Sequence, residues 1–164
     1  ALSRGTNNPL FNVWVPSDFS CSECQKHYDM FQSLYERYGD KVRFNFTHLS
    51  SAITLSSIVA ECCAEQGKFW EMHDLIFLNT PRDTVDFLNL AERIDVDKNK
   101  LLKCLRNSSD IQKRIGSNMS QLSALNVNVT PTLIVDGTLY YGEFSLEKIS
   151  EYIDEIISKK QERG

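Results

Sequence analysis

Hydrophobic and polar positions follow two periods along this chain, and each period predicts a different element. An apolar run at residues 10–15 is rich in β-forming residues and predicts a buried strand, which Pro16 should end. Apolar residues recur at helical spacing over residues 21–38, and Gly39 follows as a stop signal. Alternation over residues 41–49 predicts a second strand. The chain therefore opens as strand, helix, strand.

A long helical block follows these three elements. From residue 51 to about residue 124 the pattern is helical almost throughout. Two strands follow, at residues 132–135 and 138–141, joined by the hairpin signal Asp136-Gly137. Ser145 should cap a closing helix that has its isoleucines on one face. This order predicts an α/β, thioredoxin-like fold with an all-helical insertion between its two halves.

Composition is consistent with one domain over residues 1–164. The order of the predicted elements places the thioredoxin core at about 8–50 and 118–160 and the helical insertion at about 51–117. The 164 residues are 41% hydrophobic and 24% charged, which excludes disorder and coiled coil. The net charge of −4 and the lack of a long basic block make nucleic acid and anionic membranes poor partners. No apolar run approaches the roughly 18 residues that would suggest a membrane span. We expect any targeting segment to have been removed.

The candidate chemistry lies in the motif Cys21-Ser22-Glu23-Cys24. Cys21 falls just after a predicted strand, in the first turn of a helix, where free backbone N–H groups and the helix dipole favour a thiolate. Cys24 lies three residues further on, faces inward and could attack a mixed disulfide formed at Cys21. We interpret the pair as redox-active, with Cys21 as nucleophile and Cys24 as resolving cysteine.

The same pair of cysteines also occurs in other kinds of site. A zinc site would need two further ligands from the other cysteines and the three histidines, but there is no second such motif and no histidine pair. Haem attachment needs histidine directly after the second cysteine, where Gln25 stands. Two buried structural thiols, or an inert disulfide, stay open as alternatives. We expect no metal and no cofactor.

A second candidate element is Thr130-Pro131, just before the third strand. A proline here can simply mark a strand edge or a turn. A cis peptide bond would instead bring the Thr130 backbone beside the Cys21 sulfur, where an extended substrate could pair with it. The residues alone leave both interpretations open.

Three segments resemble the DsbA family of thioredoxin-fold thiol–disulfide oxidoreductases. They are Phe19-Ser20-Cys21-Ser22-Glu23-Cys24, residues 65–77 (EQGKFWEMHDLIF) and residues 127–137 (VNVTPTLIVDG), in family order. The middle segment separates this family from plain thioredoxins and glutaredoxins. The resemblance implies a catalytic disulfide at Cys21 and Cys24, a cis-proline at Pro131, and an extracytoplasmic bacterial setting such as the periplasm. It also implies reduced or misoxidised exported proteins as substrates, and a membrane partner that recharges the pair.

The chain departs from the family's strongest oxidants in two places. Ser22-Glu23 stands where they carry Pro-His, and the Glu23 charge should oppose the Cys21 thiolate, so we predict a less oxidising pair. Val15 replaces the family's buried acid six residues before the first cysteine. We therefore expect water to carry the proton to or from Cys24. Asp18 is closer in sequence and could substitute for the acid, but we expect it to cap the helix instead.

The resemblance also suggests a structural disulfide between Cys63 and Cys104, since some relatives have cysteines in these segments. It would close a loop of about 42 residues and contribute roughly 4 kcal/mol. Cys62 could take the place of Cys63, but neighbours on a helix point about 100° apart, so only one should face Cys104. Three buried thiols are the alternative.

We thus expect a protein thiol–disulfide oxidoreductase that forms disulfides in exported proteins. The same pair could instead run in reverse, as a reductase or isomerase. An alternative of another class is a redox-silent module that binds extended peptides. The sequence does not indicate the oligomeric state.

Overall fold

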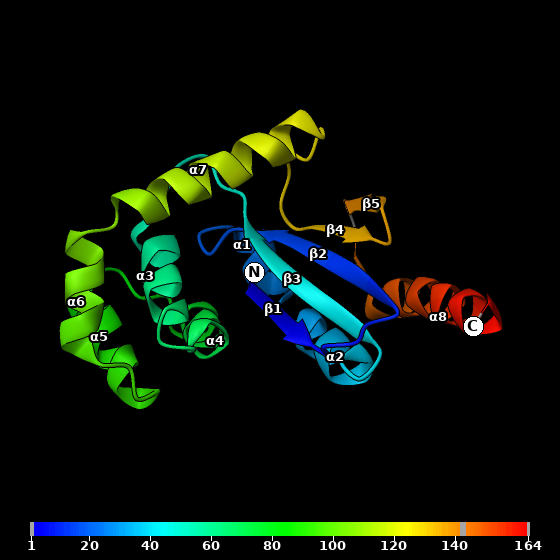
Figure 1. Cartoon of the computed structure of the whole chain (residues 1–164), viewed down its shortest axis with the longest axis horizontal. Coiled ribbons are helices and arrows are strands. Elements are labelled where there is room, and N and C mark those ends of the chain that lie inside the picture. The colour runs from blue at the N-terminus through cyan, green and yellow to red at the C-terminus, as the bar shows by residue number, and fades with distance from the viewer. Residues whose placement is uncertain (1, 142–143, 164) are drawn as a thin grey trace. The chain divides into compact units, whose positions relative to one another are not determined.

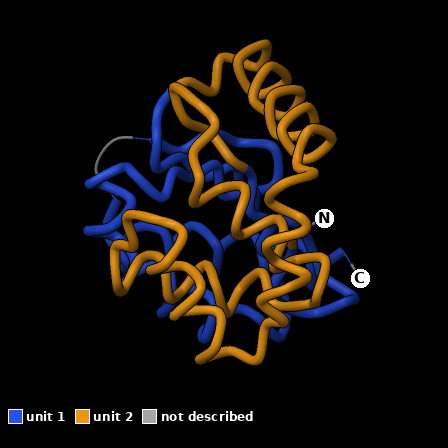
Figure 2. The backbone as a smooth tube through the Cα atoms, turned by 90° about the vertical axis from the view of Figure 1, so that its left-hand side faces the viewer, with its two compact units in different colours: residues 1, 3–47, 129–164 blue, residues 2, 48–128 orange. Residues whose placement is uncertain are grey.

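The computed structural model describes residues 2–141 and 144–163. The chain forms two compact units, one containing residues 3–47 and 129–164, the other containing residues 48–128 (Figure 2). Helix α7 (Ser109–Ala124) is one continuous helix that lies wholly within the second of these units. Among the described residues, no helix has the length and hydrophobicity needed to cross a membrane.

The first unit is built on a five-stranded sheet with the strand order β1-β3-β2-β4-β5. Helices α2 and α8 lie on one side of this sheet (Figure 1), and the Tyr38 hydroxyl of α2 donates a 2.8 Å hydrogen bond to Asp154 of α8. The strands are β1 (Leu2–Gly5), β2 (Phe11–Ser17), β3 (Val42–His48), β4 (Thr132–Val135) and β5 (Thr138–Tyr141), and the helices are α1 (Ser22–Lys26), α2 (Tyr28–Tyr38) and α8 (Leu146–Arg163).

Strand β2 has two faces of different polarity, and its end leads to the motif. Val13, Val15 and Ser17 are all buried on one face, whereas Trp14, on the other face, is 42% exposed. Successive side chains of a strand point to opposite faces, so this pattern fixes which residues point into the core. The antiparallel pairing with β4 involves Val13 and Trp14. Pro16 lies beyond these pairs, which is why the strand continues through it, contrary to the prediction.

The predicted helix over residues 21–38 is two helices, α1 and α2, which meet at His27. The His27 backbone leaves the helical region at φ −92° and ψ 5°. Its ring Nδ1 lies 2.7 Å from the Glu23 carbonyl, the same carbonyl that the His27 backbone N–H bonds at 3.1 Å. The His27 ring thus competes with the His27 backbone N–H for the Glu23 carbonyl. A hydrophobic pattern gives no sign of such a polar contact, so it did not predict the break between the two helices. Strand β1 was also missed, because its sequence is short and polar.

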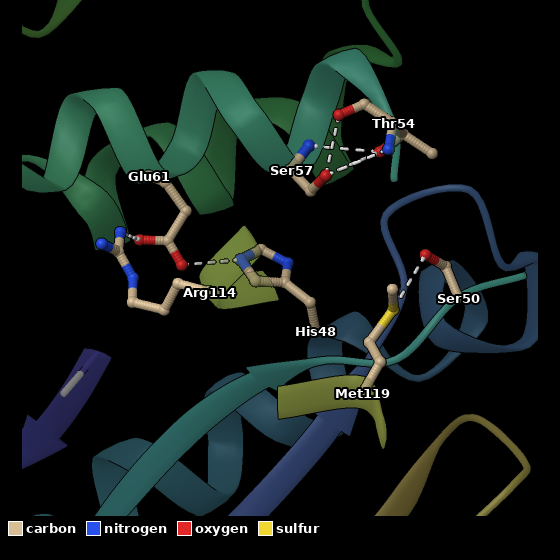
Figure 3. Close-up of polar contacts among 7 residues, drawn as sticks. All are labelled: His48, Ser50, Thr54, Ser57, Glu61, Arg114 and Met119. Carbon is tan, nitrogen blue, oxygen red and sulfur yellow. Dashed lines mark hydrogen bonds and ion pairs between the residues drawn. The ribbon is translucent and has the colours of Figure 1, made fainter. Parts of the chain in front are cut away.

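The second unit is all-helical, as predicted. Thr54 begins the first helix with a capping box, in which its side chain and that of Ser57 bond each other's backbone N–H groups (Figure 3). Asp83 and Asp97 cap two later helices through the same kind of side-chain acceptor. The helices are α3 (Leu55–Ala64), α4 (Phe69–Asn79), α5 (Thr84–Arg93), α6 (Lys98–Arg106) and α7.

Three polar side chains form a cluster in this unit, in which those of His48 and Glu61 are buried and that of Arg114 is half exposed. His48 Nε2 lies 3.1 Å from one carboxylate oxygen of Glu61 on α3, and Arg114 of α7 bonds the other at 3.2 Å (Figure 3). Burial acts to raise the pKa of the Glu61 carboxyl, but the hydrogen bonds and charges of His48 and Arg114 outweigh it and lower that pKa. The cluster therefore stabilises the folded chain while Glu61 is ionised.

We expect acid to weaken this cluster. Because the folded pKa of Glu61 is depressed below its ordinary value of 4.5, its contribution is present above that pH and is lost as the pH falls through the folded value. Glu61→Gln should cost roughly 1–3 kcal/mol at pH 7 and should flatten the loss of unfolding free energy below about pH 4.5. Urea unfolding at a series of pH values measures both effects, with the exposed Glu92→Gln as control. Equal acid sensitivity in Glu61→Gln and the unsubstituted chain would contradict the prediction.

The structural disulfide joins Cys62, not Cys63, to Cys104. The pairing Cys63–Cys104 is therefore wrong. Both residues 62 and 63 lie on α3, and the step of about 100° between them turns Cys62 toward α6, with its Cα 5.9 Å from that of Cys104. Cys63 points into the helical core instead, where it is fully buried.

Candidate redox site

The turn between β2 and α1 places Cys21 at the N-cap of α1. Its backbone is extended (φ −81°, ψ 120°), and its Sγ accepts a hydrogen bond from the Cys24 backbone N–H at 3.3 Å. The side chain is partly exposed. A sulfur at this position replaces the oxygen of an ordinary N-cap residue, so a negative charge on it would be stabilised by the N–H groups of the first turn.

Thr130 lies on the other side of the same sulfur. The Cys21 thiol donates to the Thr130 carbonyl at 3.5 Å, a contact between residues 109 positions apart in the sequence. The peptide bond from Thr130 to Pro131 is cis. Pro131 directly precedes β4, which pairs with β2, so neighbouring strands carry the cysteine and the prolyl turn. The structure thus brings the two candidate elements of the sequence together.

Cys24 lies behind Cys21 in the core, with 2% of its surface exposed. Burial raises the pKa of its thiol to about 12. Hydrogen bonds from the Asp18 backbone and the Ser17 hydroxyl act in the opposite direction, and the neighbouring Cys21 raises the pKa further. The two cysteines are therefore chemically unequal, with an accessible outer sulfur and a protonated inner one.

Ser22 and Glu23, the two residues between the cysteines, are both exposed. The Glu23 carboxylate forms an ion pair with Lys26 one turn further on, at 3.1 Å. An exposed pair of this kind is worth little to stability, but the ammonium group offsets part of the negative potential that Glu23 places near the motif. Sequence reasoning missed Lys26, although its i,i+3 spacing from Glu23 was a visible signal.

Ser17 is the other residue that sequence reasoning missed. It is 6% exposed and follows Val13 and Val15 on the buried face of β2, so the period of two along the strand could have indicated it. Asp18 could have substituted for the family's buried acid, but its carboxylate bonds Ser20 instead. It accepts hydrogen bonds from the Ser20 backbone at 2.9 Å and the Ser20 hydroxyl at 2.6 Å, which fixes the turn before Cys21.

The remaining cysteines belong to the helical unit. Burial, and secondarily the charge of Glu71, raises the pKa of the Cys63 thiol to about 12. A pocket of about 740 Å³ borders Cys62 and Cys104, and its other lining residues also lie in the helical unit. In the described part of the chain, no group of three or more His, Cys, Asp or Glu side chains could hold a metal ion.

A five-stranded sheet interrupted by a helical unit, with a CxxC at a helix start and a cis-prolyl turn beside it, defines a thioredoxin-fold protein of the DsbA-like type. A family model described as thioredoxin matches residues 3–155. The chain belongs to the thioredoxin family, and it shares its fold with a solved DsbA-type protein. The predicted fold class, with its helical insertion, is confirmed.

Relatives of two kinds match the chain in sequence. Over 153 residues it is 29% identical to the Na⁺/H⁺ antiporter NhaA 3 of Salinispora tropica, a match that covers 90% of this chain and 23% of the antiporter. Over 172 residues it is 25% identical to the probable disulfide bond formation protein D of Bacillus cereus, covering 96% of this chain and 79% of that protein. The chain thus spans about a quarter of the length of the antiporters it matches.

The fold is also found in solved structures. The thiol-disulfide exchange protein alpha-DsbA2 from Wolbachia pipientis superposes with a TM-score of 0.81 at 19% identity. The match covers 94% of this chain and 86% of that one. At this level of identity the similarity concerns the fold.

Proposed function

We propose that this chain is a thiol–disulfide oxidoreductase that acts on protein thiols through Cys21 and Cys24. The observation that carries the proposal is the position of the Cys21 sulfur. It is partly exposed, lies between the Cys24 N–H at 3.3 Å and the Thr130 carbonyl at 3.5 Å, and has a buried thiol behind it. The similarity to a probable disulfide bond formation protein supports the same chemistry.

In the oxidising direction the pair begins as a disulfide. A substrate thiolate attacks Cys21 Sγ, the bond between Cys21 and Cys24 breaks, and Cys24 leaves as a thiolate that takes up a proton. A second substrate thiolate then attacks the substrate sulfur of the mixed disulfide and releases Cys21 as a thiolate. Two electrons pass from substrate to the pair. The Thr130 backbone, held at Pro131, would align an extended substrate beside Cys21.

We place this activity outside the cytoplasm, on exported proteins, with a membrane redox partner that reoxidises the pair. Two observations support this setting. The Cys62–Cys104 disulfide is of a kind that persists in oxidising compartments, and one similar solved structure is described as a periplasmic thioredoxin-like protein from Salmonella enterica.

The reduction potential tests both the activity and its direction. Equilibration with glutathione buffers, read by thiol labelling, should give a value between those typical of strong oxidants, about −120 mV, and of reductants, about −270 mV. Glu23→Gln should raise it by up to about 30 mV, because removing the carboxylate favours the Cys21 thiolate and hence the reduced pair. A value at −270 mV would favour reductase activity, and failure of the pair to equilibrate would refute the proposal.

A further inference from the structure

The turn between β2 and α1 is held by hydrogen bonds from both of its sides. From the strand side, the Asp18 carboxylate accepts from the Ser20 backbone N–H at 2.9 Å, and the Asp18 carbonyl accepts from the Cys21 N–H at 3.1 Å. From the helix side, the side-chain amide of Gln25 donates to the Phe19 carbonyl at 3.3 Å. Gln25 therefore closes the turn that presents Cys21, and the proposed reaction gives it no part.

We propose that Gln25 is a positioning residue, which holds Cys21 in line for the step in which Cys24 closes the disulfide. The inference rests on the proposed function, because this step reoxidises the pair. In it the Cys24 thiolate attacks Cys21 Sγ of a mixed disulfide, the Cys21–Cys24 bond forms, and the other sulfur leaves as a thiolate. The rate of such an intramolecular attack depends on how well the reacting atoms are held in place.

Gln25 contacts the backbone on both sides of Cys21. Its own N–H donates to the Cys21 carbonyl at 3.1 Å, the hydrogen bond that begins α1, while its side chain reaches back to the Phe19 carbonyl. The dihedral angles of Ser20 and Cys21 lie between these two carbonyls. One residue thus limits how the backbone that carries the Cys21 sulfur can turn.

The Phe19 end of this link is fixed in the core. Phe19 is 5% exposed, and its ring stacks on that of Phe46 in β3 with the ring centroids 5.5 Å apart. Helix α1 has only five residues, and a helix this short has few hydrogen bonds of its own to hold its first turn. The Gln25 side chain therefore ties the start of α1 to a buried part of the sheet.

Loss of the Gln25 donor should slow the closing of the disulfide more than its opening. Once the Cys21–Cys24 bond exists, the ring itself holds Cys21, whereas a mixed disulfide has no such ring. In Gln25→Met, which keeps a long side chain without a donor, we expect the closing rate to fall about three- to ten-fold and the opening rate to change less than about twofold. A tenfold fall would raise the reduction potential by about 30 mV.

Stopped-flow mixing with acid quench and mass spectrometry at pH 7 measures both rates. Reduced protein in excess oxidised glutathione forms a mixed disulfide at Cys21, and the decay of this species to the closed pair, independent of glutathione concentration, gives the closing rate. Reduced glutathione added to the oxidised protein gives the opening rate, and equilibration with glutathione gives the potential.

Further variants separate the hydrogen bond from packing and stability. Gln25→Lys, which keeps a donor on a long side chain, should restore the closing rate. The matched control is Gln121→Met, the same substitution at an exposed residue of α7, which should leave both rates unchanged. Urea unfolding establishes that each variant is folded, and Gln25→Ala replaces Gln25→Met with the same expectations if the latter does not fold.

Three outcomes would overturn the inference. An unchanged closing rate in Gln25→Met, with an active parent chain, would remove the role of Gln25 alone and leave the proposed function standing. Equal falls in the closing and opening rates, with an unchanged potential, would show a general loss of reactivity at Cys21 in place of a positioning effect. A parent chain without exchange activity would remove both the proposed function and the role of Gln25.

Discussion

Replacing Cys21 with serine is expected to lower the rate of thiol–disulfide exchange to that of the uncatalysed reaction. The hydroxyl that replaces the thiol does not ionise at neutral pH and cannot form a mixed disulfide. Insulin reduction and the oxidation of a two-cysteine peptide measure the loss in the two directions. The fold should persist, because the Cys21 side chain is partly exposed and its N-cap role suits serine.

Two further variants make this result specific. Cys24→Ser should retain the partly exposed Cys21 thiol, which attacks the disulfide form of the peptide, releases one peptide sulfur as a thiolate and accumulates a mixed disulfide, visible by mass spectrometry as an adduct at Cys21. Cys63→Ala is the matched control, since it removes a thiol that is buried in the helical unit and should leave the exchange rate unchanged. Exchange rates at the uncatalysed level in both Cys21→Ser and the unsubstituted chain would favour a peptide-binding module with an inert motif, whereas full activity in Cys21→Ser would show that Cys21 is not the nucleophile.

The second large effect concerns stability. Removing the Cys62–Cys104 disulfide with paired alanine substitutions should lower the free energy of unfolding by about 4 kcal/mol, because the unfolded chain loses a cross-link spanning 42 positions. Urea unfolding under non-reducing conditions measures the change. The exchange activity of the folded protein should persist, since the disulfide and the redox motif belong to different units.

Dithiothreitol provides an independent check of that value. Reducing the unsubstituted chain should lower its unfolding free energy by a similar amount, and the same reagent should not destabilise the paired alanine variant. A loss below about 1 kcal/mol would show that the cross-link does not constrain the unfolded state as the loop length predicts.

Residues close together in the sequence were enough to predict most of the elements and the location of the chemistry, apart from β1 and the division between α1 and α2. The change of period from two to 3.6 separated strands from helices, and the hairpin at Asp136-Gly137 follows from residues that tolerate positive φ, which both adopt. The motif Cys21-Ser22-Glu23-Cys24 could be placed at a helix start because the strand before it was readable. These features depend on residues close together in the sequence.

Features that depend on distant residues, or on the exact direction of a side chain, could not be predicted in this way and follow from the packing of the folded chain. Packing placed the Thr130 carbonyl beside Cys21 across 109 positions and chose Cys62 over Cys63 through the direction each side chain takes on α3. A periodic pattern gives the face on which a residue lies, but not which other element packs against that face. The partners of the two sulfur atoms in the motif, and so the difference between an accessible nucleophile and a buried resolving thiol, follow from that packing.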